Sequence, residues 1–169
     1  MKIFIKILLI LLLGGIISLS SCFKADVYPP EPQIEFIDFT FHDSIKEYNI
    51  LKGVLHFSFI DGDGNVGFGT GANSPKTVFI NKYKIENNIP VKIELDDEII
   101  NYKVPEFSTS GNRKYLKGEI IINSLDELAP INSNDTIMYE FYIIDRDYNE
   151  SNTENTGYLI PGDYLKNEK

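Results

Sequence analysis

The sequence Leu-His-Phe-Ser-Phe at residues 55–59 alternates strictly between apolar and polar side chains. Because successive side chains of a β-strand point to opposite faces, this spacing predicts a strand with one face turned to a hydrophobic core. The next stretch, Ile-Asp-Gly-Asp-Gly-Asn-Val-Gly at residues 60–67, combines glycines with Asp and Asn, which are typical of tight loops. Residues 55–67 therefore predict a half-buried strand that ends in an acidic loop.

Similar strand patterns recur along most of the chain. An earlier strand is expected from Ile34 to Phe41, with a bulge near Ile37 and Asp38 because the alternation slips there. Turn-forming residues separate the runs. Further strands are expected at residues 77–80, 91–95, 99–104, 115–122, 137–144 and 156–160, and one helical turn at 124–129, with Ser124 as its N-cap and Glu127 three residues later.

The number and spacing of these short strands predict an all-β fold. About seven to eight strands, without any long helical pattern, favour a single antiparallel β-sandwich. No repeat or change of composition divides the chain, so we expect one domain at residues 33–163 and a C-terminal tail at 164–169.

The first 21 residues have the pattern of a signal peptide. Lys2 and Lys6 form a basic start, and residues 7–17 are apolar apart from two glycines. A membrane-spanning helix needs about 20 apolar residues, and Lys6 and the serines at 18, 20 and 21 shorten this run. Cleavage after residue 21 is the favoured interpretation, with an uncleaved anchor helix as the alternative.

The only cysteine of the chain follows directly. Leu19-Ser20-Ser21-Cys22 resembles the lipobox of bacterial lipoproteins, in which small residues precede a cysteine that is acylated before cleavage. The resemblance implies lipidation of Cys22 and attachment to the outer membrane of the cell envelope, on either its periplasmic or its surface face. Three prolines at 29, 30 and 32 predict that residues 22–32 form an extended, semi-rigid tether.

Charge narrows the range of partners. Removal of residues 1–21 leaves 148 residues and shifts the formal net charge from −9 to −11, because Lys2 and Lys6 are lost with them. A chain this acidic, without a basic stripe, repels phosphate backbones, so nucleic-acid binding is not expected. The negative charge of the chain favours solubility or the binding of cations.

Motifs of catalysis are scarce in the sequence. His42 and His56 are the only histidines, and no nucleophile elbow, glycine fingerprint or H-E-x-x-H motif occurs. The acidic run Asp96-Asp97-Glu98 is best explained as a solvated hairpin tip. We therefore do not expect an enzyme.

Two longer motifs resemble exported lipoproteins of Bacteroidota. Residues 57–67 look like their FxFxDGDGDIG strand and loop, with Asn65 in place of an aspartate. Residues 142–153 look like the end of their penultimate strand, with Asp147-Tyr148 in place of a small Ala-Gly turn. The resemblance implies an immunoglobulin-like sandwich and brings no known activity.

The two motifs contain the candidate metal ligands. Asp61, Asp63 and Asn65 alternate with glycines, a spacing that turns oxygen ligands toward one centre, as calcium requires. The loop is not an EF-hand, since Val66 and Ala72 stand where that motif has Gly and Glu. Turn formation without any metal is the alternative. In the resembled sandwich the second loop reaches the same end and adds Asp145, Asp147 and Asn149.

Three classes of function remain open from the sequence. The first is a membrane-anchored, non-catalytic interaction or structural module with an unknown protein or glycan partner, which calcium at the acidic loops would stabilise. The second is a glycan-binding accessory lipoprotein of a surface uptake complex, and the third a small hydrolase. Asp43-Ser44-Ile45 and Asp135-Thr136-Ile137 also resemble O-glycosylation acceptors of exported Bacteroidota proteins, which makes Ser44 and Thr136 candidate modification sites.

Overall fold

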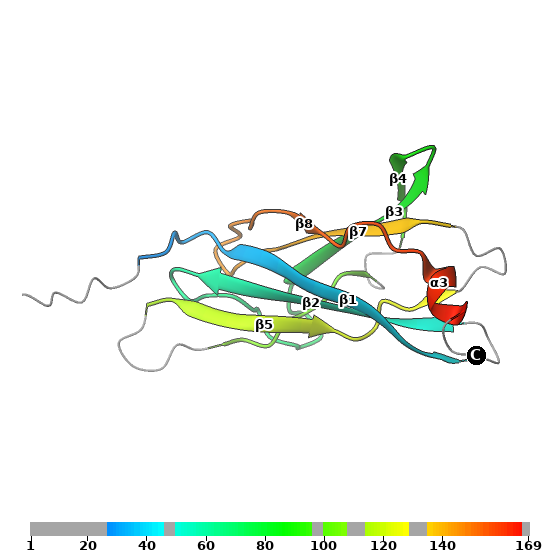
Figure 1. The fold of residues 1–169 in the computed structure, drawn as a ribbon. Helices are drawn as coiled ribbons and strands as arrows, with labels where there is room; N and C mark the ends of the chain where they lie inside the picture. Colours follow the sequence, from blue (N-terminus) through cyan, green and yellow to red (C-terminus); the bar gives the residue numbers. More distant parts are fainter. Residues whose placement is uncertain (1–26, 46–49, 96–99, 108–113, 129–134, 167–169) are drawn as a thin grey trace, which may run out of the picture.

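The computed structural model describes residues 27–45, 50–95, 100–107, 114–128 and 135–166, and their strands form two antiparallel sheets packed face to face (Figure 1). This arrangement confirms the predicted antiparallel all-β sandwich of seven to eight strands. One sheet has the order β1-β2-β5, from β1 (Gln33–Ile45), β2 (Ile50–Asp61) and β5 (Leu116–Ile122), with β6 (Glu127–Leu128) paired to the start of β2. The other has the order β4-β3-β7-β8, from β4 (Ile89–Ile93), β3 (Val78–Glu86), β7 (Ile137–Ile143) and β8 (Glu154–Asn155), and is followed by helix α3 (Pro161–Lys166).

The core lies between the two sheets and follows the alternation seen in the sequence. Leu55, Phe57 and Phe59 of β2 are buried, while the side chains between them are only half-buried. The ring of Phe57 lies 5.0 Å from that of Phe141 on β7, which brings the two sheets into contact. The predicted bulge in β1 is also present, because its pairing with β2 shifts register at Ile37.

Two predicted strands are wrong. Of residues 100–104, the part of this run that the structure describes, only Tyr102 pairs, in a single bridge to Val78, and Pro105 soon removes a backbone donor. Residues 156–160 do not form a strand either, because Gly157 adopts a φ of 67° and turns the chain after β8. A single bridge joins Leu159 to the start of β7.

The predicted helical turn at 124–129 is also wrong. Glu127 and Leu128 form β6 instead, and Ser124 does not cap a helix, because its hydroxyl donates to the Tyr102 hydroxyl. The backbone N–H of Leu125 donates to the carbonyl of Gly53, which directs this segment onto β2. Pairing with the sheet thus overrides the local capping pattern.

The edge of β1 is held by a side chain from the segment between β7 and β8. The Asn152 side-chain oxygen accepts from the backbone N–H of Ile34 at 2.8 Å, and its amide nitrogen donates to the Ile34 carbonyl at 2.9 Å. An amide group that both donates and accepts replaces a neighbouring strand at this point. Asn152 therefore joins β1 to the segment between β7 and β8.

Strands β3 and β4 form a hairpin that projects beyond the sandwich (Figure 1). Its two turn residues, Asn87 and Asn88, have φ angles of 52° and 63°, as a two-residue hairpin turn of this hand requires. Pro90 lies opposite Ile85, whose N–H points away from β4 and donates to the Thr136 carbonyl. The backbone nitrogen of Pro90 correspondingly faces the free edge of β4.

Both ends of the domain differ from the predicted boundaries. The expected tether is too long at its domain end, because Pro32 is buried and the Gly62 N–H donates to the Pro29 carbonyl at 3.0 Å. The expected C-terminal tail is wrong at its start, since Tyr164 of α3 packs its ring 4.9 Å from that of Phe41. Every described strand follows Val27, so a chain lacking residues 1–21 retains all of them.

The predicted signal peptide and Cys22 lie outside the described residues. Within the described part of the chain, no helix has the length and apolar character that crossing a membrane requires.

Candidate metal centre

The two acidic loops lie side by side at the end of the sandwich where the chain enters the domain (Figure 1). Strand β2 ends at Asp61, and Asp145 follows β7 after one residue. Val66 and Asp145 form an antiparallel bridge, and the Arg146 N–H donates to the Asn65 carbonyl at 3.2 Å. Backbone pairing therefore fixes the separation of the loops and confirms that they reach the same end.

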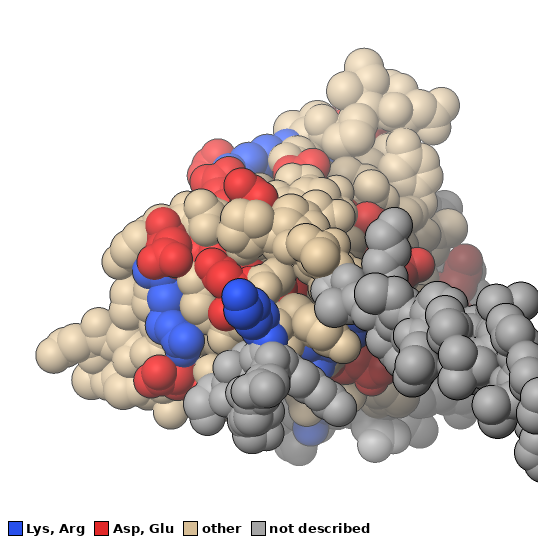
Figure 2. Space-filling view, turned by 90° about the vertical axis from the view of Figure 1, so that its left-hand side faces the viewer, with Lys and Arg blue, Asp and Glu red and all other residues tan. Residues whose placement is uncertain are grey.

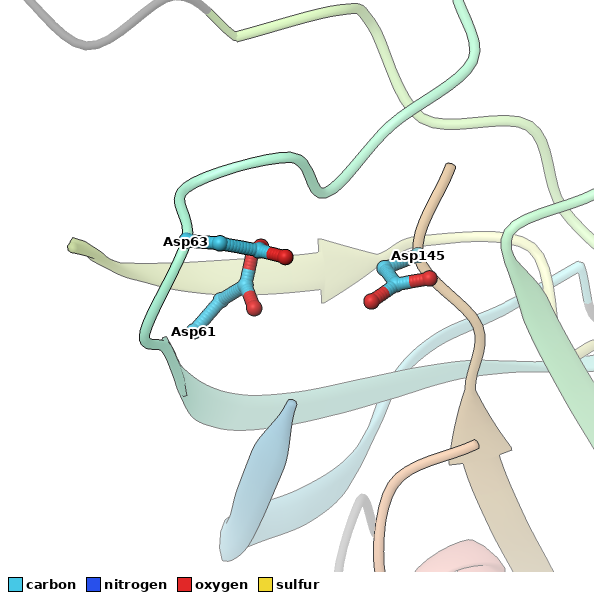
Figure 3. A group of neighbouring side chains, drawn as sticks. All are labelled: Asp61, Asp63 and Asp145. Atoms are coloured by element: carbon cyan, nitrogen blue, oxygen red, sulfur yellow. The ribbon is translucent and has the colours of Figure 1, made fainter. Parts of the chain in front are cut away.

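Three carboxylates converge between these loops. Figure 3 shows Asp145 across the gap from Asp61 and Asp63, and the three groups each offer an oxygen within 4.8 Å of the others. Asp61 and Asp145 are completely buried, whereas Asp63 is exposed. The group thus has a closed base and one side open to solvent.

These dimensions fit a calcium ion. Calcium binds oxygen at about 2.3–2.6 Å, so two ligands of one ion lie no more than about 5 Å apart. Two buried oxygens of the first loop also have no hydrogen-bond partner, namely Oδ1 of Asp61 and Oδ1 of Asn65. An unpaired buried carboxylate oxygen is costly, and coordination to a cation removes that cost.

Turn formation accounts for the remaining oxygens. Oδ2 of Asp61 accepts from the Asn65 N–H at 2.7 Å. Oδ1 of Asp145 accepts from the N–H groups of Asp147 and Asn149, both at 2.8 Å. The alternative that these residues only shape turns therefore explains Asp145 well, but it leaves Oδ1 of Asp61 without a role.

The remaining three predicted ligands lie around the carboxylate cluster in different roles. The Asn65 amide donates to Asp63 at 3.1 Å and to Asp147 at 3.0 Å, so it links the two loops. Asp147 is exposed and outside the group of three carboxylates. Asn149 directs its amide nitrogen, not its oxygen, to Oδ2 of Asp145 at 2.8 Å and thus orients that carboxylate.

The cluster is electrostatically strained without a cation. Burial, opposed by the hydrogen bond from the Asn65 N–H and reinforced by the charges of Asp63 and Asp145, raises the pKa of Asp61 to about 6. Partial loss of hydration and the charges of Asp145 and Asp147 also raise the pKa of Asp63. A divalent cation would relieve this repulsion.

Sequence reasoning missed two supporting residues. The Arg146 guanidinium donates to the Gly67 carbonyl at 3.3 Å and pairs with Glu106 at 3.2 Å, which ties the two loops to a third segment. Tyr148 adopts a φ of 63°, a strained conformation for an aromatic residue, and packs 5.5 Å from Phe68. Figure 2 looks onto this end, where acidic side chains are interspersed with basic ones.

The two candidate glycosylation sites lie away from this centre in the sequence. Thr136 is half-buried next to β7, while the side chain of Ser44 lies outside the described residues. Comparison of the chain with protein-family models, curated proteins and solved structures found no match.

Proposed function

We propose that this protein is an exported lipoprotein, anchored to the outer membrane through Cys22, whose β-sandwich is a non-catalytic interaction module stabilised by calcium. The signal-peptide pattern and the lipobox-like Leu19-Ser20-Ser21-Cys22 support the anchor. The cluster of Asp61, Asp63 and Asp145 supports the calcium site. The ion would bridge two loops that belong to different sheets, and so stabilise the end of the sandwich nearest the tether.

One observation carries the calcium proposal. Asp61 is completely buried, and its Oδ1 has no hydrogen-bond partner among the described residues. Buried polar groups are nearly always paired in folded proteins, so an unpaired oxygen beside two further carboxylates indicates a cation ligand.

Calcium is expected to raise the melting temperature of the soluble chain, residues 22–169 with Cys22→Ser. At a calcium concentration about 100 times the Kd, binding adds about 2.7 kcal/mol to the free energy of unfolding. For a domain of this size, the melting temperature should then rise by about 5–10 °C. Calorimetry in millimolar calcium and in chelator measures the shift.

Asp61→Asn provides the matched test, because the amide oxygen still accepts from the Asn65 N–H while the charge is lost. Its melting temperature should not respond to calcium, whereas the exposed Asp38→Asn should respond like the parent chain. Equal melting temperatures of the parent chain in calcium and in chelator would disprove the site.

Cys22→Ala is expected to abolish acylation. Because acylation precedes cleavage at a lipobox, chains that stay uncleaved keep the apolar segment of residues 7–17, and only chains that are still cleaved should leave the membrane fraction. Once the signal peptide is removed, lipid is the only remaining hydrophobic attachment. Metabolic labelling with a fatty acid and fractionation of cells measure both effects. A variant that is processed to the same size and stays membrane-bound in high salt would contradict the lipoprotein assignment.

The glycan-binding alternative has weaker support. Phe79 and Tyr142 stack on each other at 5.2 Å, so each ring covers one face of the other. Tyr28 and Tyr115 likewise pack edge to face at 5.0 Å. Each of these contacts occupies ring surface on which a sugar could otherwise stack, and for this reason we favour the interaction module.

A further inference from the structure

The domain end of the tether lies directly on the first acidic loop. The Gly62 N–H donates to the Pro29 carbonyl at 3.0 Å. A Cβ atom at position 62 would lie 2.2 Å from the Pro29 carbonyl oxygen and 2.4 Å from that of Tyr28, so a side chain there would displace the tether. Gly62 stands between Asp61 and Asp63. One glycine thus separates two of the three carboxylates and contacts the tether.

Further contacts hold the same segment on the domain. The Tyr28 ring packs against Tyr115, and the Lys117 ammonium lies 4.6 Å from the centre of the Tyr28 ring, within the range of a cation–π interaction. Pro32 is completely buried just before β1. The neighbouring Val27 is 92% exposed, so the docked segment begins at Tyr28.

We propose that calcium in the acidic loop docks residues 28–32 of the tether and so sets the direction in which the domain stands on its anchor. The inference rests on the proposed calcium site. Without the ion, the like charges of Asp61 and Asp63 repel each other on either side of Gly62, and the loop loses the geometry that directs the Gly62 N–H at Pro29. With the ion, both carboxylates are held at one centre and the tether contact is kept.

Calcium binding and tether docking are thermodynamically linked, so the coupling between them can be tested by changing either one. If calcium favours the docked tether, a docked tether must favour calcium by the same factor. Tyr28→Ala removes the ring contact with Tyr115 and Lys117 and leaves the carboxylates unchanged. Calcium affinity of this variant, measured by titration calorimetry on residues 22–169 with Cys22→Ser, is expected to fall about 5-fold or more, the lower end of couplings of ordinary size. Phe79→Ala, on the other sheet, serves as the control and should retain the parent affinity.

Pulsed electron paramagnetic resonance measures docking itself. With spin labels on Val27→Cys and Thr153→Cys in the Cys22→Ser chain, we expect one narrow distance distribution in calcium and a broad one in chelator. The label pair Lys52→Cys and Thr153→Cys, placed on strand β2 and the β7–β8 segment, should show no change. Asp61→Asn should give the broad Val27–Thr153 distribution in both conditions.

The outcomes separate the two proposals. If calorimetry detects calcium binding but the Val27–Thr153 distribution is the same with and without calcium, the tether inference is wrong and the calcium site stands. If calorimetry detects no calcium binding, both proposals fail. An unchanged calcium affinity in Tyr28→Ala would also overturn the coupling.

Discussion

Glu127→Ala is expected to lower the free energy of unfolding by about 3–5 kcal/mol, the usual cost of removing one partner from a buried ion pair. Glu127 is 7% exposed and belongs to β6, in the sheet of β1, β2 and β5. Its carboxylate forms an ion pair with Lys82 on β3 and accepts a hydrogen bond from the Tyr139 hydroxyl on β7. The variant leaves the Lys82 ammonium, whose side chain is only 15% exposed, and the buried Tyr139 hydroxyl without their shared partner.

Two further variants separate charge from hydrogen bonding at this position. Glu127→Gln retains an acceptor for Tyr139 and removes the charge, so its loss should be smaller than that of Glu127→Ala. Lys82→Met combined with Glu127→Leu replaces the pair with apolar groups and should recover much of the stability, as buried pairs often do. Urea unfolding measures all three. A loss below about 1 kcal/mol for Glu127→Ala would show that the contacts of Glu127 with Lys82 and Tyr139 do not hold the two sheets together.

Stability in the absence of calcium should fall as the pH rises from 4 to 7, through the titration of Asp61. Its pKa is about 6 in the folded protein and 3.8 as an ordinary aspartate, so between these values the folded state binds more protons than the unfolded state. Each pKa unit corresponds to about 1.4 kcal/mol, so the full loss is about 3 kcal/mol, of which about 2.4 kcal/mol falls between pH 4 and pH 7. Calcium should cancel this loss at pH 7, because it binds the ionised carboxylate.

Asp61→Asn isolates this contribution from that of the other acids. In chelator, the stability of the variant relative to the parent chain should increase by about 2.4 kcal/mol from pH 4 to pH 7, since the amide does not ionise. Asp38→Asn, an exposed site, should show no such change. Urea unfolding at the two pH values measures the difference. If the variant and the parent have the same pH dependence, the Asp61 carboxyl is not destabilised by burial.

Periodicity was a reliable guide wherever one face of a strand is buried. The alternation at residues 55–59 predicts β2, and the slip at Ile37 predicts the bulge in β1, because both reflect which side chains enter the core. The resemblance of the two motifs predicts that the acidic loops lie at one end of the sandwich, and the bridge between Val66 and Asp145 confirms it.

Long-range contacts explain the wrong helical turn at residues 124–129. Glu127 has the spacing of a capping residue, but its partners Lys82 and Tyr139 are distant in the sequence and draw it into the core as part of β6. Within the candidate site, spacing alone did not distinguish ligands from supporting groups. Asn149 has the same local pattern as Asn65, but only the fold shows that its amide nitrogen faces Asp145.

Pro90 has a consequence for contacts between molecules. Strand β4 ends its sheet, and an exposed edge strand with apolar residues such as Ile89 and Val91 is a template for pairing with another chain. The outward backbone nitrogen at position 90 carries no hydrogen, and the next outward position carries the charged side chain of Lys92. A second chain approaching this edge would find one donor missing and a cation beside it. The projecting hairpin is therefore protected against edge-to-edge aggregation, even where many copies are crowded together.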